Sequence, residues 1–180
     1  MSEPYDVLVV CEGNLCRSPL AERLLASRLA RTEVRVASAG VHAVVGAPMD
    51  ALAAAELTRL GGDPSGFEAR QLTPNMVTEA SLVLAATRTI RGQVVATAPA
   101  ALKRTFTLLE LAALLEAPPW DGHESDVAGT LARAADWRAS VSGLGSDLDV
   151  PDPIGRSPQV HRTAADLADR ATRVIAAWLG

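Results

Sequence analysis

Two side chains that together could carry out phosphoryl chemistry stand six positions apart near the start of the chain, Cys11 and Arg17. A cysteine thiolate is a nucleophile, and a planar guanidinium can hold two oxygens of a phosphoryl group. An apolar run precedes Cys11, and Pro19 suits the first position of a helix. The pattern predicts a strand, a short loop and a helix beginning at Pro19. Such a loop directs backbone N–H groups and the positive end of a helix toward one point, where an oxyanion can bind and be attacked.

The residues inside this loop fit the same chemistry. Gly13 allows the backbone to approach a ligand closely, and Asn14 tolerates left-handed backbone geometry. Converging N–H dipoles and the nearby arginine favour the thiolate form of Cys11, and the hydroxyl group of Ser18 can donate a hydrogen bond that eases the departure of the sulfur. A buried structural cysteine beside a surface arginine is the alternative interpretation. The residues expected to bind phosphate are Glu12, Gly13, Asn14, Leu15, Cys16, Arg17 and Ser18.

A candidate for proton transfer stands near the other end of the chain. Breaking a phosphate ester requires a proton for the leaving oxygen, and a carboxylic acid can supply it. Asp152 lies between Pro151 and Pro153, which restrict its backbone to extended geometry and hold its carboxyl group in one direction. Asp147 and Asp149 are rivals, but their surroundings are rich in glycine and serine.

Four apolar segments alternate with helical patterns along the chain. The segments expected to be strands are residues 5–10, 34–38, 82–85 and 105–109. A β-α-β alternation predicts an α/β fold, here a single-domain three-layer fold with a central four-stranded parallel sheet flanked by helices. The phosphate-binding loop would follow the first strand, at the carboxyl end where such sheets bind ligands.

The helices between and after these strands have recognisable start signals. Asp50 caps a helix that ends before Gly61, and Thr73 precedes a brief one. Further helices are expected at residues 110–117, at 125–140 with Ser125 as the cap, and from Pro158 with Ser157 as the cap. On the last helix the predicted core-facing stripe consists of Val160, Ala164, Leu167, Ala171, Val174 and Trp178.

Length and composition narrow the class of protein. The chain has 180 residues, 48% of them hydrophobic, which suits one domain over residues 1–180. A net charge of −4 gives no reason to expect nucleic acid or a membrane surface as a partner. Without a leader sequence or a long apolar run, we expect a cytoplasmic protein. The histidines are scattered along the sequence without ligand spacing, so neither a metal nor a cofactor is expected; they are His42, His123 and His161.

The segment from Cys11 to Pro19 resembles the phosphate-binding loop of the low-molecular-weight protein tyrosine phosphatases. Three later segments agree with it: Ser38-Ala39-Gly40, residues 69–72 and Val150-Pro151-Asp152-Pro153. The resemblance implies a cysteine-dependent phosphomonoester hydrolase, specifically a protein-tyrosine phosphatase. It also implies a phosphoenzyme on Cys11, with Asp152 first as general acid and then as the base that activates water.

The resemblance extends to partners. It implies a phosphorylated protein, with phosphotyrosine, as the substrate. Residues 38–46 resemble bacterial members that are paired with tyrosine kinases of polysaccharide export, which implies a cognate tyrosine kinase. Leu15 agrees, since members with a bulky aliphatic residue there resemble tyrosine phosphatases and those with threonine tend toward phosphoarginine.

Several positions depart from the family pattern. Ile154 stands where many members carry an aromatic residue that grips a phenyl ring, and Glu12 stands where the loop is usually apolar or neutral. A carboxylate there would repel a dianion or favour a cationic group beside the phosphate. Phe67 replaces a histidine that commonly holds the loop asparagine. The expected substrate rim is Glu12, His42 and Ile154.

Two alternative functions and the role of Cys16 stay open. An arsenate reductase of the same fold would use Cys11 against arsenic, and a phosphate-binding module would use the loop without cleaving anything. Cys16 either forms a reversible disulfide with Cys11 under oxidation or is buried without redox function.

Overall fold

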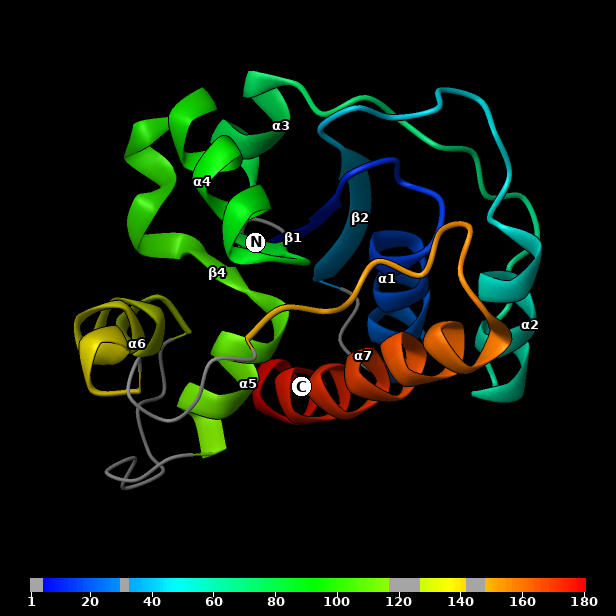
Figure 1. Cartoon of the computed structure of the whole chain (residues 1–180). Helices are drawn as coiled ribbons and strands as arrows, with labels where there is room; N and C mark the ends of the chain where they lie inside the picture. Colours follow the sequence, from blue (N-terminus) through cyan, green and yellow to red (C-terminus); the bar gives the residue numbers. More distant parts are fainter. Residues whose placement is uncertain (1–4, 30–32, 117–126, 142–147) are drawn as a thin grey trace.

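The computed structural model describes residues 5–29, 33–116, 127–141 and 148–180 (Figure 1). A four-stranded parallel sheet with strand order β2-β1-β3-β4 forms its centre. The strands are β1 (Tyr5–Cys11), β2 (Val34–Gly40), β3 (Leu82–Ala85) and β4 (Thr105–Thr107). The helices are α1 (Arg17–Arg28), α2 (Ala51–Arg59), α3 (Pro74–Glu79), α4 (Arg88–Thr97), the 3₁₀ helix η1 (Pro99–Arg104), α5 (Leu108–Glu116), α6 (Val127–Val141) and α7 (Pro158–Leu179).

Helices cover both faces of the sheet, which confirms the predicted three-layer α/β architecture (Figure 1). Alternate residues of β1 supply the two cores because successive side chains of a strand point to opposite faces. Val7 and Val9 pack with α1, α5 and α7, whereas Leu8 and Val10 pack with α3 and α4. This double burial explains why the strand is a continuous apolar run without alternation.

The start of α5 differs from the prediction. Residues 105–109 were expected to be one strand, but β4 ends at Thr107, and Leu108 begins the helix. The reason is a capping box: the Glu110 N–H donates to Thr107 Oγ1, and the Thr107 N–H donates to the Glu110 carboxylate, both at 3.1 Å. Two reciprocal hydrogen bonds therefore override the strand tendency of Leu108 and Leu109.

The other helix boundaries follow the sequence signals closely. Asp50 caps α2 and Thr73 caps α3, as predicted, each with a side chain that accepts backbone hydrogen bonds. The helix after the loop begins at Arg17, two residues before Pro19, so that boundary was wrong. Ser157 occupies the cap position of α7 but its side chain makes no capping hydrogen bond. The predicted cap Ser125 lies outside the described residues.

The buried face of α7 is rotated from the predicted stripe. Of that stripe only Ala164 and Ala171 are buried. The face that contacts the core also includes His161, Ala165 and Ala168, whereas Val174 and Trp178 of the predicted stripe are only partly buried against it. No helix in the described ranges is long and apolar enough to cross a membrane.

Candidate active site

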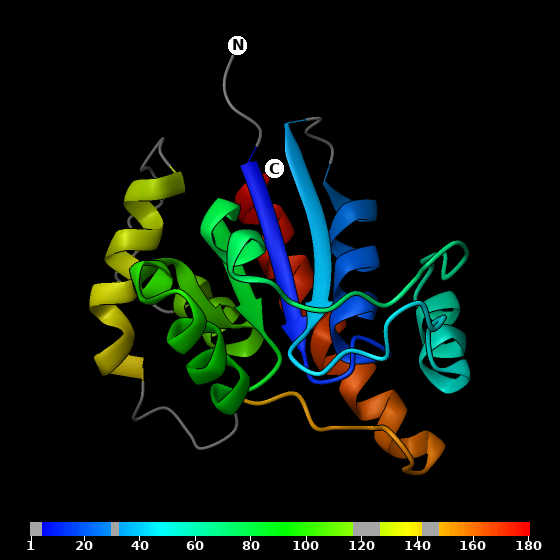
Figure 2. The ribbon, with the colours of Figure 1, turned by 90° about the horizontal axis from the view of Figure 1, so that it is seen from above.

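The predicted phosphate-binding loop lies at the carboxyl edge of the sheet, between β1 and α1. Figure 2 shows it meeting two other segments there, the one that follows β2 and the one that precedes α7. Parallel pairing places the end of β1 beside the end of β2, with Cys11 opposite Gly40. The fold thus brings the loop, the segment after β2 and the segment before α7 to one edge of the sheet.

The backbone of this loop presents free donors. The first helical hydrogen bond runs from the Leu20 N–H to the Cys16 carbonyl at 3.2 Å. Within the described part of the chain, the N–H groups of residues 12–18 have no hydrogen-bond acceptor. Together with the positive end of α1, these donors form a concave anion site of the kind that holds phosphate.

Cys11 and Ser18 are paired inside the loop. The Sγ atom of Cys11 lies 3.0 Å from Oγ of Ser18, and both residues are buried. Ser18 also contacts the carbonyl of Ala39 at 3.4 Å. Either atom can be the donor, and the hydroxyl group of Ser18 lies within hydrogen-bonding distance of the sulfur.

Arg17 is held in place from the opposite end of the chain. Its Nη1 donates to the carbonyl of Val150 at 3.3 Å, and its Nη2 lies 3.1 Å from Oδ2 of Asp152. The Arg17 side chain is 8% exposed and that of Asp152 is 52% exposed. A buried guanidinium and a solvent-facing carboxyl group therefore sit side by side at the loop.

The rival carboxylates have another role or lie outside the described residues. Asp149 accepts a hydrogen bond from the Arg88 N–H at 2.8 Å, at the beginning of α4, and its Oδ1 lies 3.4 Å from the Arg88 guanidinium. It is thus engaged away from Arg17. Asp147 falls within a stretch that the structure does not describe. Of the two candidates in the described residues, Asp152 is the one whose carboxylate lies beside Arg17.

Asn14 fixes the shape of the loop through a closed network. Its backbone adopts the left-handed conformation, with φ of 55°, and its side chain is fully buried. The Nδ2 group donates to Ser18 at 2.9 Å and to Ser38 at 2.8 Å, and Oδ1 accepts from the Arg70 N–H at 2.8 Å. All three hydrogen-bonding positions are satisfied without a histidine. Phe67, at the position expected to alter this network, is buried in the core instead.

The glycine that the loop requires is Gly40, which the sequence analysis named only as part of the segment Ser38-Ala39-Gly40. A Cβ atom on Gly40 would lie 2.6 Å from the Glu12 carbonyl oxygen and 2.9 Å from the Asn14 nitrogen. Both are backbone atoms, so the loop would have to move. Gly13, by contrast, would bring its Cβ only into ordinary contact with Leu15, at 3.8 Å.

The rim residues Glu12 and His42 lie together. Oε1 of Glu12 is 2.7 Å from Nδ1 of His42, and both side chains are exposed. The segment after β2 is attached to the loop by backbone hydrogen bonds from Val41, His42 and Val44 to residues 11–13. Ile154 is exposed on the segment before α7. The sequence-based prediction missed two exposed apolar neighbours on the rim segment, Val44 and Val45.

The Cys16 side chain is buried at the end of the loop. Burial, followed by the negative charge of Asp50, raises the pKa of the Cys16 thiol well above its usual range. Cys16 is therefore a neutral thiol at neutral pH. It also belongs to the group of side chains that could hold a metal ion among the described residues, with Asp50 and His161.

The chain is similar to known proteins in both sequence and structure. The model of the family described as low molecular weight phosphotyrosine protein phosphatase matches residues 6–121. The low molecular weight protein-tyrosine-phosphatase Etp of Escherichia coli K12 is 44% identical over 101 residues, which cover 56% of this chain and 67% of Etp.

Two solved structures are similar over nearly the whole chain. The YwlE arginine phosphatase of Geobacillus stearothermophilus has a TM-score of 0.73 and 28% identity, covering 98% of this chain and 93% of that one. Vibrio vulnificus Wzb in complex with benzylphosphonate has a TM-score of 0.70 and 26% identity, covering 97% and 98%. With the family match spanning the loop and most of the sheet, the chain belongs to the low molecular weight protein-tyrosine-phosphatase family.

Proposed function

We propose that the protein hydrolyses phosphate monoesters on tyrosine side chains of proteins, through a covalent phosphoenzyme on Cys11. The observation that carries the proposal is the convergence of the Cys11–Ser18 pair, the free N–H groups of residues 12–18 and the Arg17–Asp152 pair at one edge of the sheet. A site that only bound phosphate would need neither a nucleophile nor a proton donor.

In the first step the Cys11 thiolate attacks phosphorus. The loop N–H groups and the Arg17 guanidinium hold the non-bridging oxygens and stabilise the charge that develops on them. Asp152 gives its proton to the bridging oxygen as the P–O bond breaks, so that the product leaves as a neutral alcohol or phenol. The products are the dephosphorylated chain and Cys11 thiophosphate.

In the second step water attacks the thiophosphate. Asp152, now a carboxylate, takes a proton from the water, and the sulfur leaves as a thiolate that accepts a hydrogen bond from Ser18. The O–P bond forms as the S–P bond breaks, which releases inorganic phosphate and restores both residues. A reactive thiol also needs a reducing compartment, so we place the enzyme in the cytoplasm.

Phosphotyrosine is the substrate we favour. Leu15 is the bulky aliphatic residue that the family resemblance associates with tyrosine phosphatases, and Etp, the 44% identical relative, carries that activity in its name. We accordingly propose a phosphotyrosine protein as the substrate, and a tyrosine kinase as the partner that creates it.

Phosphoarginine is the second candidate, and a specific observation favours it. Glu12 places a carboxylate at the rim of the loop, where it would attract the guanidinium that carries the phosphoryl group. The structurally similar YwlE is named an arginine phosphatase. Against this candidate, Glu12 already has His42 as a partner at 2.7 Å.

The experiment compares phosphate release from one peptide sequence carrying either phosphotyrosine or phosphoarginine. We expect a higher kcat/KM for phosphotyrosine, and no release from either peptide by Cys11→Ser. Preference for phosphoarginine would move the assignment to the second candidate. Absence of release from both, with arsenate reduction in the presence of a small thiol, would instead identify an arsenate reductase.

A further inference from the structure

Behind the loop, three side chains with metal-binding chemistry meet although the sequence keeps them far apart. Cys16 ends the loop, Asp50 caps α2, and His161 lies in the first turn of α7. The Cys16 Sγ, a carboxylate oxygen of Asp50 and a ring nitrogen of His161 all lie within 4.8 Å of one another. Three separate segments therefore converge on one point.

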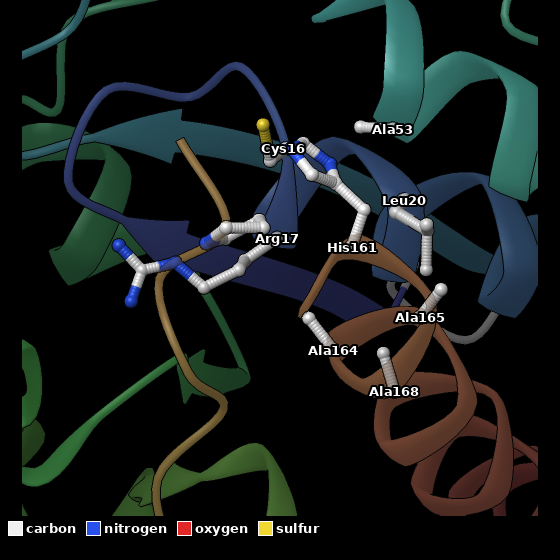
Figure 3. Close-up of a pocket in the computed structure, with 9 residues that line it drawn as sticks. Cys16, Arg17, Leu20, Ala53, His161, Ala164, Ala165 and Ala168 are labelled. Atoms are coloured by element: carbon white, nitrogen blue, oxygen red, sulfur yellow. The ribbon is translucent and has the colours of Figure 1, made fainter. Parts of the chain in front are cut away.

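His161 has an unsatisfied nitrogen at this point. Its side chain is 2% exposed, and Nδ1 is buried without a hydrogen-bond partner among the described residues. The Oδ1 atom of Asp50 is 3.6 Å away, too far for a hydrogen bond. Figure 3 shows the imidazole ring lying beside the Cys16 side chain. A buried polar atom without a partner costs free energy, and a ligand that it could bind would recover that free energy.

Asp50 is already oriented for this role. Its Oδ1 accepts hydrogen bonds from the N–H groups of Leu52 and Ala53 at 3.0 and 3.1 Å. Hydrogen bonds of this kind fix the direction of a ligating carboxylate. The same Oδ1 atom lies 3.6 Å from Nδ1 of His161, so the bonds that cap α2 also hold this carboxylate oxygen at the site.

We propose that Cys16, Asp50 and His161 bind a zinc ion. A thiolate, an imidazole and a carboxylate are the donors that zinc prefers, and water would complete the tetrahedron. As the sulfur–zinc bond forms, the Cys16 thiol releases its proton to solvent. Zinc bonds of about 2.0–2.3 Å place ligand atoms about 3.5 Å apart. The Asp50 and His161 atoms, 3.6 Å apart, already match this spacing. The other distances, all within 4.8 Å, must shorten by about 1 Å at most.

The surroundings allow this movement. A small cavity is lined by Cys16 and His161, and the small residues Ala53, Ala164, Ala165 and Ala168 form part of its wall (Figure 3). Because the wall has short side chains, His161 and Cys16 can turn toward each other without displacing the backbone. The ion would tie the loop, α2 and α7 together, and it would occupy the sulfur that could otherwise pair with Cys11.

The test measures zinc retained after equilibrium dialysis in the Cys11→Ser background, which removes the other thiol and does not depend on the proposed reaction. We expect a single bound zinc ion per chain, and binding at least tenfold weaker after His161→Ala. Asp50→Asn, which keeps an N-cap residue on α2, should weaken binding in the same way. His42→Ala is the matched control, because it removes a histidine from the exposed pair with Glu12 and should leave zinc binding unchanged.

A second readout identifies the sulfur. Cobalt added in place of zinc should produce a thiolate-to-cobalt charge-transfer band in Cys11→Ser, and the band should be missing when Cys16→Ser is added. Far-ultraviolet circular dichroism checks that each variant is folded. If His161→Ala does not fold, zinc binding by Asp50→Asn decides whether the site exists. Zinc binding that His161→Ala and Asp50→Asn leave unchanged would overturn the proposal, as would the absence of bound zinc and of the cobalt band in Cys11→Ser.

Discussion

The guanidinium of Arg17 lies 3.1 Å from the carboxylate of Asp152, across almost the whole length of the chain. An ion pair with one exposed member contributes little to stability, so the role of this pair is to position the two side chains. Arg17 binds the transferred phosphoryl group in our proposal, and the pair places the proton donor beside that group. We propose that the oxygens of a bound phosphate compete with Asp152 for Arg17, which frees the carboxyl group to face the leaving oxygen.

The role of Asp152 predicts a dependence on the leaving group. In Asp152→Ala we expect kcat/KM for phenyl phosphate to fall by about 10²- to 10⁴-fold, the usual range for general acid catalysis. The fall should be much smaller for p-nitrophenyl phosphate, because nitrophenolate leaves without a proton. Asp149→Ala is the control: it loses the contact with Arg88 and should affect both substrates equally. An equal loss on both substrates in Asp152→Ala would argue against proton donation.

Asn14 should be important for stability as well as for the loop. Asn14→Ala removes three buried hydrogen bonds at about 1 kcal/mol each and leaves alanine in the left-handed region. We expect the free energy of unfolding in urea to drop by about 3 kcal/mol. Asn75→Ala, on an exposed position of α3, should change it by less than about 0.5 kcal/mol. Equal effects of the two substitutions would contradict the network.

Gly40 and Gly92 offer a matched pair of glycine-to-alanine substitutions. Gly40→Ala forces a Cβ to within 2.6 Å of the Glu12 carbonyl oxygen, so the loop must shift. We expect a loss of about 1–3 kcal/mol in stability and a lower kcat/KM. Gly92 lies in α4, where an added Cβ would meet nothing within 4 Å beyond the helix's own backbone, so Gly92→Ala should stabilise by about 0.5–1 kcal/mol. Wild-type kinetics in Gly40→Ala would show that the close contact is unimportant.

Glu12 should limit the entry of dianionic aryl phosphates. Glu12→Leu removes a negative charge from the rim, and a change of about 1 kcal/mol in the interaction with a dianion corresponds to roughly a fivefold rise in kcat/KM for phenyl phosphate. His42→Ala should have the opposite effect, because it leaves the Glu12 carboxylate without its partner at 2.7 Å. An unchanged or lower kcat/KM in Glu12→Leu would place Glu12 outside the path of the substrate.

Much of the fold could be predicted from local signals in the sequence. The apolar run of β1, the caps at Asp50 and Thr73, and the four strands all appear in the structure, because each depends on neighbouring residues. The end of β4 was missed because a reciprocal capping box at Thr107 and Glu110 outweighs the strand tendency of two leucines. That pattern, threonine followed three residues later by glutamate, was available in the sequence.

Contacts between distant segments were harder to foresee. Asn14 depends on the backbone N–H of Arg70, and the loop depends on the missing side chain of Gly40. Neither dependence leaves a local trace in the residue pattern. The histidines showed no ligand spacing along the sequence, yet the fold carries His161 to Cys16 and Asp50. Spacing in the sequence is therefore a test only for metal sites built on one local segment.

The covalent intermediate on Cys11 is the feature that most directly distinguishes the proposed mechanism from binding of phosphate without cleavage. Asp152→Ala is mixed with p-nitrophenyl phosphate, quenched in acid and measured by intact-protein mass spectrometry. The first step should proceed, because the leaving group needs no proton, while hydrolysis is slowed by the loss of the base. We predict one phosphoryl group on Cys11, and none when Cys11→Ala is added. Turnover by Asp152→Ala without any phosphorylated Cys11, or turnover by Cys11→Ser, would contradict the mechanism.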